Sequence, residues 1–168
     1  LEALGQGEGA TLFMVLLAGF AALLSRVTGQ EDMILGSPIA NRRHKQIEPL
    51  MGFFLNLLAF RMRSGGDPTF RELLGQTRET ALSAYAHQDL PFERLVEELA
   101  VERDLSRHPL FQTTLVLQNA AMPQLTLPGL EVGLLEVDWG TTAFDLGFFF
   151  WETALWESLD EGLSVVVN

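Results

Sequence analysis

The sequence predicts an α/β fold of the α+β kind, in which helices pack on a mixed β-sheet. Segments with helical and strand-like apolar patterns alternate in the first half of the chain, and strand-like segments dominate the second half. The 168 residues, of which 48% are apolar, suffice for one domain with a sizeable core. A mean hydropathy of +0.19 leaves two interpretations open, a large core or an apolar face that meets another part of a larger protein.

The first expected element is a buried helix over residues 12–24, an uninterrupted apolar run. The run is shorter than the roughly 20 residues that cross a bilayer. Thr11 can cap its start and Gly29 its end. Apolar residues occupy every face, so we expect the helix to lie between two layers. The glycine-rich residues 5–9 lack the G-K-[ST] of a phosphate loop and are expected to form a flexible segment ahead of this helix.

Two strands and a second helix are expected next. A short strand over residues 33–35 should stop at Gly36-Ser37-Pro38, because proline lacks the backbone N–H. Residues 55–63 form a second apolar strand. The following helix can start with Asp67 as its cap and Pro68 as its first residue, or with a capping box of Thr69 and Glu72.

Helical spacing predicts which side chains of the next two helices face the core. On the first helix these are Phe70, Leu73, Leu74, Thr77, Ala81, Leu82 and Tyr85. On the shorter second helix, which has Pro91 in its first turn, they are Phe92, Leu95, Val96 and Leu99. Further strands are expected at 111–118, 131–137, 144–151 and 163–167.

Charge and composition exclude several kinds of partner. The net charge of −11 argues against nucleic acid, which needs a cationic face. The cluster Arg42-Arg43-His44-Lys45 is either a solvated loop or a contact with another lobe or a carrier protein. Without cysteine there is no disulfide or thiolate metal site, and no histidines have metal-ligand spacing, so we expect no metal. No signal peptide is visible and no membrane contact is expected, which favours a cytoplasmic location.

Four segments carry the strongest functional signal. In order along the chain they are Gly36-Ser37-Pro38-Ile39-Ala40-Asn41-Arg42, Met51-Gly52-Phe53-Phe54-Leu55-Asn56-Leu57-Leu58-Ala59-Phe60-Arg61, His87-Gln88-Asp89-Leu90-Pro91-Phe92-Glu93 and Arg103-Asp104-Leu105-Ser106-Arg107-His108-Pro109-Leu110. Their order and spacing resemble signatures of the condensation domains of nonribosomal peptide synthetases. The sequence departs from the family pattern at Leu55, Leu57 and His108, where valine, threonine and asparagine are usual.

The resemblance also points to something the chain lacks. The family's H-H-x-x-x-D-G signature, which carries its catalytic histidine, does not occur, since the histidines are His44, His87 and His108. In the family that signature lies N-terminal to the four segments. We therefore expect residues 1–168 to be the C-terminal, chloramphenicol-acetyltransferase-like lobe of a two-lobed domain, with both ends cut and no activity alone.

The implied reaction is peptide-bond formation between donor and acceptor substrates held as phosphopantetheine thioesters on carrier proteins. The resemblance implies no cofactor bound directly to this chain. Its implied partners are the N-terminal lobe, the donor and acceptor peptidyl carrier proteins and an adjacent adenylation domain. Alternatives within the same fold are an epimerisation domain, a heterocyclisation domain and a noncatalytic recruitment domain.

Three side chains are candidates for the lobe interface or the substrate tunnel: Arg42, Asn56 and Arg61. By resemblance, Arg42 would pair with the aspartate of the missing signature. Asn56 lies in an apolar run, so its amide needs hydrogen-bond partners. His87 is expected to end a helix rather than act as a base. The residues given structural roles are Gly36, Pro38, Gly52, His87, Gln88, Asp89, Pro91, Phe92, Glu93, Arg103, Asp104, Ser106, Arg107 and Pro109.

Overall fold

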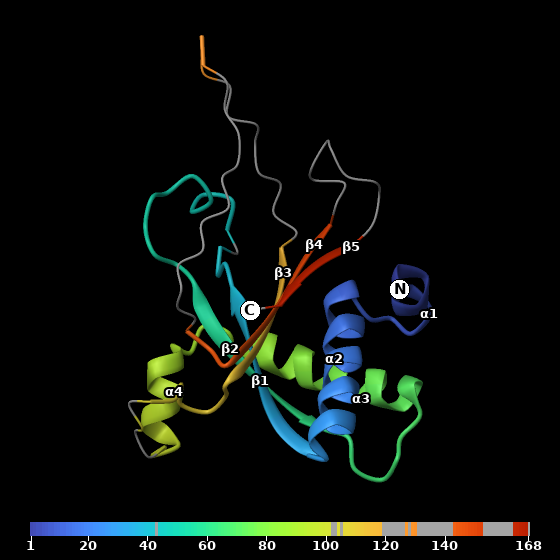
Figure 1. The fold of residues 1–168 in the computed structure, drawn as a ribbon. Coiled ribbons are helices and arrows are strands. Elements are labelled where there is room, and N and C mark those ends of the chain that lie inside the picture. The colour runs from blue at the N-terminus through green and yellow to red at the C-terminus, as the bar shows by residue number, and fades with distance from the viewer. Residues whose placement is uncertain are drawn as a thin grey trace.

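The described part of the chain is built on a five-stranded mixed sheet with strand order β2-β1-β3-β4-β5 (Figure 1). The computed structural model describes residues 1–42, 44–101, 104, 106–118, 127, 129–130, 143–152 and 163–167. The outer pairs β1·β2 and β4·β5 are antiparallel, and β1·β3 and β3·β4 are parallel, so the predicted fold class is confirmed. The strands are β1 Asp32–Ile39, β2 Asn56–Arg63, β3 Thr113–Gln118, β4 Leu146–Glu152 and β5 Leu163–Val167.

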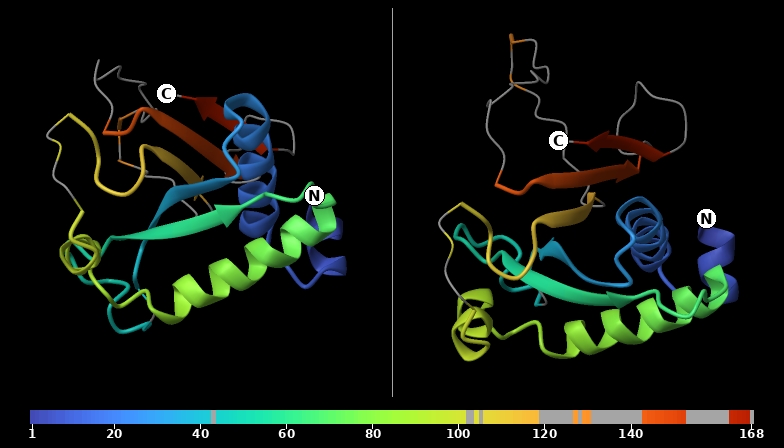
Figure 2. Two further views of the ribbon diagram at one scale, coloured as in Figure 1. Left: turned by 90° about the horizontal axis from the view of Figure 1, so that it is seen from below. Right: turned by 60° about the horizontal axis from the view of Figure 1, so that its bottom comes forward.

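Helices pack on both faces of this sheet (Figure 2). They are α1 Glu2–Gly7, α2 Leu12–Thr28, α3 Phe70–Ala86 and α4 Phe92–Glu98. Successive side chains of β2 point to opposite faces of the sheet. Phe60 and its neighbours at positions 58 and 62 join the main core with α2 and α3, whereas Leu57 and Ala59 pack with α4 in a second core. No helix in the described part of the chain is long and apolar enough to span a bilayer.

The predicted helix caps form as the sequence indicates. Thr11 accepts a hydrogen bond from the Met14 N–H at 3.3 Å, and α2 ends at Gly29 in the left-handed conformation, φ 71°. Helix α3 uses the second of its two possible starts: the Glu72 carboxylate accepts from the Thr69 N–H at 2.8 Å, and the Thr69 hydroxyl oxygen accepts from the Glu72 N–H at 3.4 Å. The box fixes the first turn of α3 at Thr69.

The glycine-rich start of the chain is not the flexible segment that the sequence predicts. Residues 2–7 form α1, in which Gly5 is buried. A Cβ on Gly5 would lie 2.7 Å from the Ala10 carbonyl oxygen, so this helix needs a glycine to pack so closely. Arg78 on α3 donates to the Gly9 carbonyl at 2.8 Å. Contacts of α1 with α2, and of Glu8 and Gly9 with α3, therefore order a segment whose own composition favours disorder.

The expectation that the first strand stops before Pro38 is wrong. Strand β1 continues to Ile39, and Pro38 pairs with Leu57 of β2. The parallel pairing of β1 with β3 has the single register position Gly36 opposite Thr114, so Pro38 lies where β1 is paired on one side. A proline is tolerated where its missing N–H has no partner strand to serve.

The buried faces of the helices are narrower than their apolar patterns predict. On α3 the buried positions lie in the middle, and Phe70 and Leu82 are exposed, as is Leu99 after α4. On α2 the buried residues end at position 21, and Leu23 is 49% exposed, so the predicted run 12–24 is not covered along its whole length. Each helix is buried only where it crosses another element. The predicted strand at 131–137 lies outside the described residues.

A glycine sets the spacing between β1 and the chain that enters β3. Gly36 and Phe111 are both buried, and a Cβ on Gly36 would lie 2.0 Å from Cε2 of the Phe111 ring. No movement short of displacing the ring would make room for a methyl group at this distance. Gly36 therefore serves close packing, which explains why a glycine fits this position of the first signature.

We predict that Gly36→Ala destabilises the complete domain by about 1–3 kcal/mol through overpacking against Phe111. Gly75→Ala is the matched control, because Gly75 lies in α3 with nothing within 4 Å of an added Cβ. Alanine there should be neutral or stabilise by up to about 1 kcal/mol through helix propensity. Thermal unfolding of the two variants measures the difference, and equal melting temperatures would contradict the Gly36–Phe111 contact.

Candidate functional site

The side-chain amide of Asn56 connects the start of β2 to the turn between α3 and α4. Its Nδ2 group donates to the carbonyls of Gln88 at 2.9 Å and Leu90 at 2.8 Å. Its Oδ1 accepts from the Phe92 N–H at 3.1 Å. Helix α4 begins after Pro91, which offers no side-chain cap, so an asparagine from β2 does the work of an N-cap for it. The sequence correctly predicts that this amide has partners, and they are backbone groups.

The signature from His87 to Glu93 forms the turn that Asn56 holds. His87 follows the last residue of α3, and its Nδ1 lies 2.9 Å from the Ser83 carbonyl oxygen. The Gln88 side chain donates to the Tyr85 carbonyl at 2.7 Å. Phe92 is buried, whereas Asp89 and Glu93 are exposed. His87 is thus engaged with its own helix, and its structural role stays a prediction.

The last signature meets this turn through aromatic packing. The His108 ring lies 5.2 Å from the ring of Phe92, 4.7 Å from that of Phe111 and 4.7 Å from that of Phe144, measured between centroids. His108 Nδ1 lies 2.9 Å from the Pro109 carbonyl oxygen. Phe111 and Phe144 do not belong to the four sequence signatures, and no local pattern could have linked Phe144 to them because it reaches this place through tertiary folding alone.

A polar turn precedes this aromatic cluster. The Asp104 carboxylate accepts from the Ser106 hydroxyl at 2.7 Å and from the Ser106 N–H at 2.8 Å. These two hydrogen bonds hold the pKa of Asp104 below its usual value, the hydroxyl more than the N–H. The Arg107 N–H donates to the Asp104 carbonyl at 3.3 Å. Arg103 lies outside the described residues.

Arg42 holds together the loop that leads from β1 to β2. Its Nη1 donates to the carbonyls of Ile47 at 2.6 Å, Glu48 at 3.0 Å and Leu50 at 2.9 Å, and its Nη2 donates to that of Gly52 at 3.3 Å. The guanidinium carbon lies 4.3 Å from the centre of the Phe54 ring, a cation–π contact. Arg42 is half-buried, whereas His44 and Lys45 of the same basic cluster are exposed. Arg43 lies outside the described residues.

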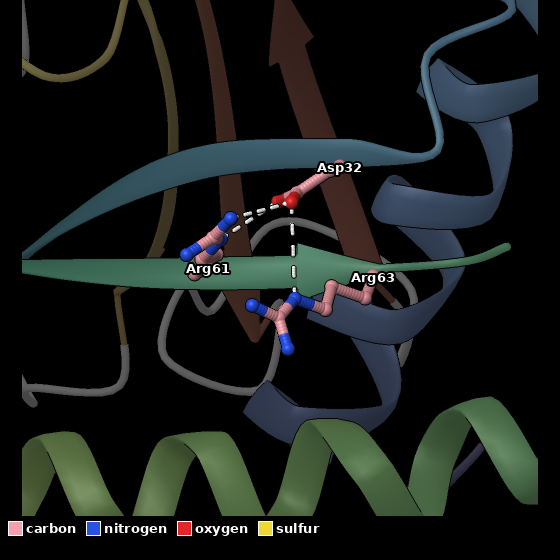
Figure 3. A network of polar contacts seen from close by, with 3 residues as sticks. All are labelled: Asp32, Arg61 and Arg63. Carbon is pink, nitrogen blue, oxygen red and sulfur yellow. Dashed lines mark hydrogen bonds and ion pairs between the residues drawn. The ribbon is translucent and has the colours of Figure 1, made fainter.

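Arg61 makes a two-point ion pair with Asp32 on the neighbouring strand (Figure 3). Its Nε lies 2.9 Å from Oδ1 and its Nη2 lies 2.7 Å from Oδ2, while Arg63 Nε lies 3.7 Å from Oδ2. The hydrogen bonds from Arg61 lower the pKa of Asp32, and the same pair raises the pKa of Arg61. Arg61 is thus paired with a residue of the same sheet, Asp32 of β1.

An open groove of about 780 Å³ runs between β2, α3 and the start of α4. Arg61, His87 and Phe92 are among its lining residues. Within the described ranges there is no group of three His, Asp or Glu side chains that could hold a metal ion. The second and third signatures contribute lining residues to this groove, and their hydrogen bonds position β2, α3 and α4 relative to one another.

We predict that Asp32→Asn lowers the stability of the complete domain at neutral pH and has no effect in strong acid. A carboxylate whose pKa is lowered on folding contributes stability above its ordinary value of 3.8, and this contribution is lost as the pH falls through the lowered value. Melting temperatures of the two proteins from pH 7 to pH 2 should therefore converge below pH 4. A constant difference over the whole range would show that the ion pair does not contribute.

Comparison with known proteins places this framework in a family. The family model described as "Condensation domain" matches residues 1–159. A linear gramicidin synthase of Brevibacillus parabrevis is 56% identical over 138 residues, which are 82% of this chain and 3% of that protein. Bacitracin synthase 3 of Bacillus licheniformis is 45% identical over 168 residues, 100% of this chain and 2% of that protein. The chain thus spans a small part of these relatives.

Solved structures of similar fold include condensation domains. The X-domain from teicoplanin biosynthesis superposes with a TM-score of 0.85 at 27% identity, over 98% of this chain and 37% of that one. The condensation domain of the Monacolin K polyketide synthase MokA gives 0.75 at 26% identity, over 97% and 37%. The first condensation domain of the CDA synthetase gives 0.69 at 21% identity, over 97% and 34%, a likeness of fold alone. The family match over residues 1–159 shows that the chain belongs to the condensation-domain family.

Proposed function

We propose that this chain is the C-terminal lobe of a condensation domain that forms peptide bonds in a nonribosomal peptide synthetase. The observation that carries the proposal is the family match over residues 1–159 together with 56% identity to a linear gramicidin synthase. The substrates would be a donor acyl or peptidyl group and an acceptor amine, each held as a thioester on the phosphopantetheine arm of a carrier protein.

The assignment to one lobe has two supports. The chain covers 37% of the MokA condensation domain and 34% of the CDA condensation domain, so the greater part of such a domain lies outside the match. The H-H-x-x-x-D-G signature does not occur among the 168 residues. We propose that the histidine of that signature comes from the N-terminal lobe and that residues 1–168 are inactive by themselves.

The contribution of this lobe would be positional. Joining two tethered thioesters requires that the amine be held against the carbonyl and that water be kept away. Asn56, Arg42 and the aromatic cluster around His108 fix the elements that would form one wall of such a site. The same proposal includes an ion pair between Arg42 and the aspartate of the missing signature. It also includes a tunnel-facing role for Arg61, which lines the groove.

The proposed partners follow from this function. They are the N-terminal lobe, donor and acceptor peptidyl carrier proteins and an adjacent adenylation domain, all in the cytoplasm. A noncatalytic recruitment domain is the second candidate, because the X-domain from teicoplanin biosynthesis has a TM-score of 0.85 and has also been solved in a complex with OxyB. Sequence identity favours the first candidate, at 56% with the linear gramicidin synthase against 27% with the X-domain. Epimerisation and heterocyclisation domains have the same fold, and the reaction product would distinguish them from a condensation domain.

We predict that the complete domain forms a dipeptidyl thioester from loaded donor and acceptor carrier proteins, and that residues 1–168 give only the uncatalysed background. Mass spectrometry of the acceptor arm measures the product, and chiral chromatography of the hydrolysed product gives its stereochemistry. Product formation by residues 1–168 alone would disprove the lobe assignment. A complete domain that binds the loaded carriers without forming product would favour the recruitment function, and an epimerised or cyclised product would favour one of the related enzymes.

A further inference from the structure

His108 completes a cluster of aromatic rings at the start of α4. Its ring lies 5.2 Å from that of Phe92, the first residue of this helix, with an angle of 30° between the ring planes. It lies 4.7 Å from the rings of Phe111, just before β3, and Phe144, just before β4. Asparagine is usual at this position in the family, and its side chain has no ring to offer. The contact between these three segments through His108 is therefore a property of this chain.

Phe92 connects this cluster to the groove between β2, α3 and α4. Its ring packs against His108 and also against Phe111, at 5.5 Å. Phe92 is at the same time one of the residues that line the groove, as is Leu95 on the same helix. The described lining residues do not include His108. His108 can therefore influence the groove through Phe92 and the helix that Phe92 begins.

His108 is also held in one orientation by hydrogen bonds. Its Nδ1 lies 2.9 Å from the Pro109 carbonyl oxygen. Because a carbonyl oxygen only accepts, Nδ1 carries the hydrogen, and the neutral ring is the tautomer whose Nε2 is unprotonated. The Gln112 side chain donates to the His108 carbonyl at 3.1 Å. These two bonds fix the ring and the backbone on which it stands.

The ring of His108 contributes more than its hydrogen bond to the position of α4. An aromatic contact and a neutral hydrogen bond make net contributions of similar size. The side chain makes three ring contacts and one hydrogen bond, whose acceptor is the neighbouring residue Pro109. That bond orients the ring but connects no two elements, whereas the ring touches α4 itself. Asparagine at position 108 would keep a donor and lose all the ring contacts.

We propose that His108 is a positioning residue of the condensation site, which sets the place of α4 along the groove through the ring of Phe92. This inference rests on the proposed function, in which Arg61 of the same groove faces the substrate tunnel. A displacement of about 1 Å from the reacting geometry can cost on the order of 100-fold in rate. His108 acts through the helix and contacts no reacting atom.

Amide hydrogen exchange in the complete condensation domain tests this role. His108→Asn introduces the residue usual in the family, and His108→Phe keeps a ring but removes the donor. His44→Asn, at an exposed histidine of the loop between β1 and β2, is the matched control. The Leu95 amide, which donates to the Pro91 carbonyl at 3.2 Å, reports on the first turn of α4. The amide of Leu17, a fully buried residue of α2, reports on the rest of the domain.

We expect the Leu95 amide to exchange at least about fivefold faster in His108→Asn and within about twofold of the parent rate in His108→Phe and His44→Asn. The Leu17 amide should be unchanged in all three variants. Equal acceleration at both amides would mean a general loss of stability and would overturn the positioning role. Parent-like exchange of Leu95 in His108→Asn, or exchange in His108→Phe as fast as in His108→Asn, would overturn it too.

A single turnover with loaded donor and acceptor carrier proteins measures the consequence for the reaction. The rate constant should fall at least about tenfold in His108→Asn and recover in His108→Phe, while the affinity for the acceptor carrier stays within about twofold. If the parent domain forms no peptide bond, the proposed function fails, and a selective effect at Leu95 still supports the placement of α4 by His108. An active domain with equal rates in the parent and His108→Asn proteins would refute the positioning role alone.

Discussion

The amide of Asn56 is the contact on which the arrangement of the signatures depends. It joins β2 to backbone groups 32, 34 and 36 positions further along the chain, and it uses both its donor and its acceptor to do so. Helix α4 has no capping side chain of its own, so without Asn56 the Phe92 N–H would lose its partner. A buried polar group left without a hydrogen bond costs on the order of 1–3 kcal/mol. The position of α4 is therefore set from β2.

The other signatures extend the same framework. Once Phe92 is placed, its ring packs against His108 and Phe111, and Phe111 in turn requires a glycine at position 36. The first and last signatures, although far apart in sequence, are thus connected through Phe111, whose ring contacts Gly36 of the first and His108 of the last. Arg42, at the end of the first signature, shapes the loop that leads to Asn56. Residues that look like four separate motifs form one connected set of packing and hydrogen-bond contacts.

Sequence reasoning succeeded where local chemistry decides the structure. The capping box of Thr69, the glycine end of α2 and the need of Asn56 for partners follow from residue types and spacing. The sequence predicts wrongly where tertiary contacts decide. Helix α1 is ordered by its packing against α2, and β1 continues through Pro38. The apolar periodicity of α3 also predicts more burial than the structure has, since Phe70 and Leu82 are predicted to face the core and are exposed. The partners of Asn56 and the role of Phe144 could not be predicted, because no local pattern encodes contacts over such separations.

Hydrogen exchange at the Phe92 amide, measured in the complete condensation domain, tests the central role of Asn56 most directly. The account predicts a protected amide in the parent protein and exchange at least about tenfold faster in Asn56→Ala, which corresponds to a loss of about 1.4 kcal/mol. Gln76→Ala, a change at an exposed polar residue of α3, should leave this amide unchanged. Equal exchange rates at Phe92 in the parent and Asn56→Ala proteins would contradict the account.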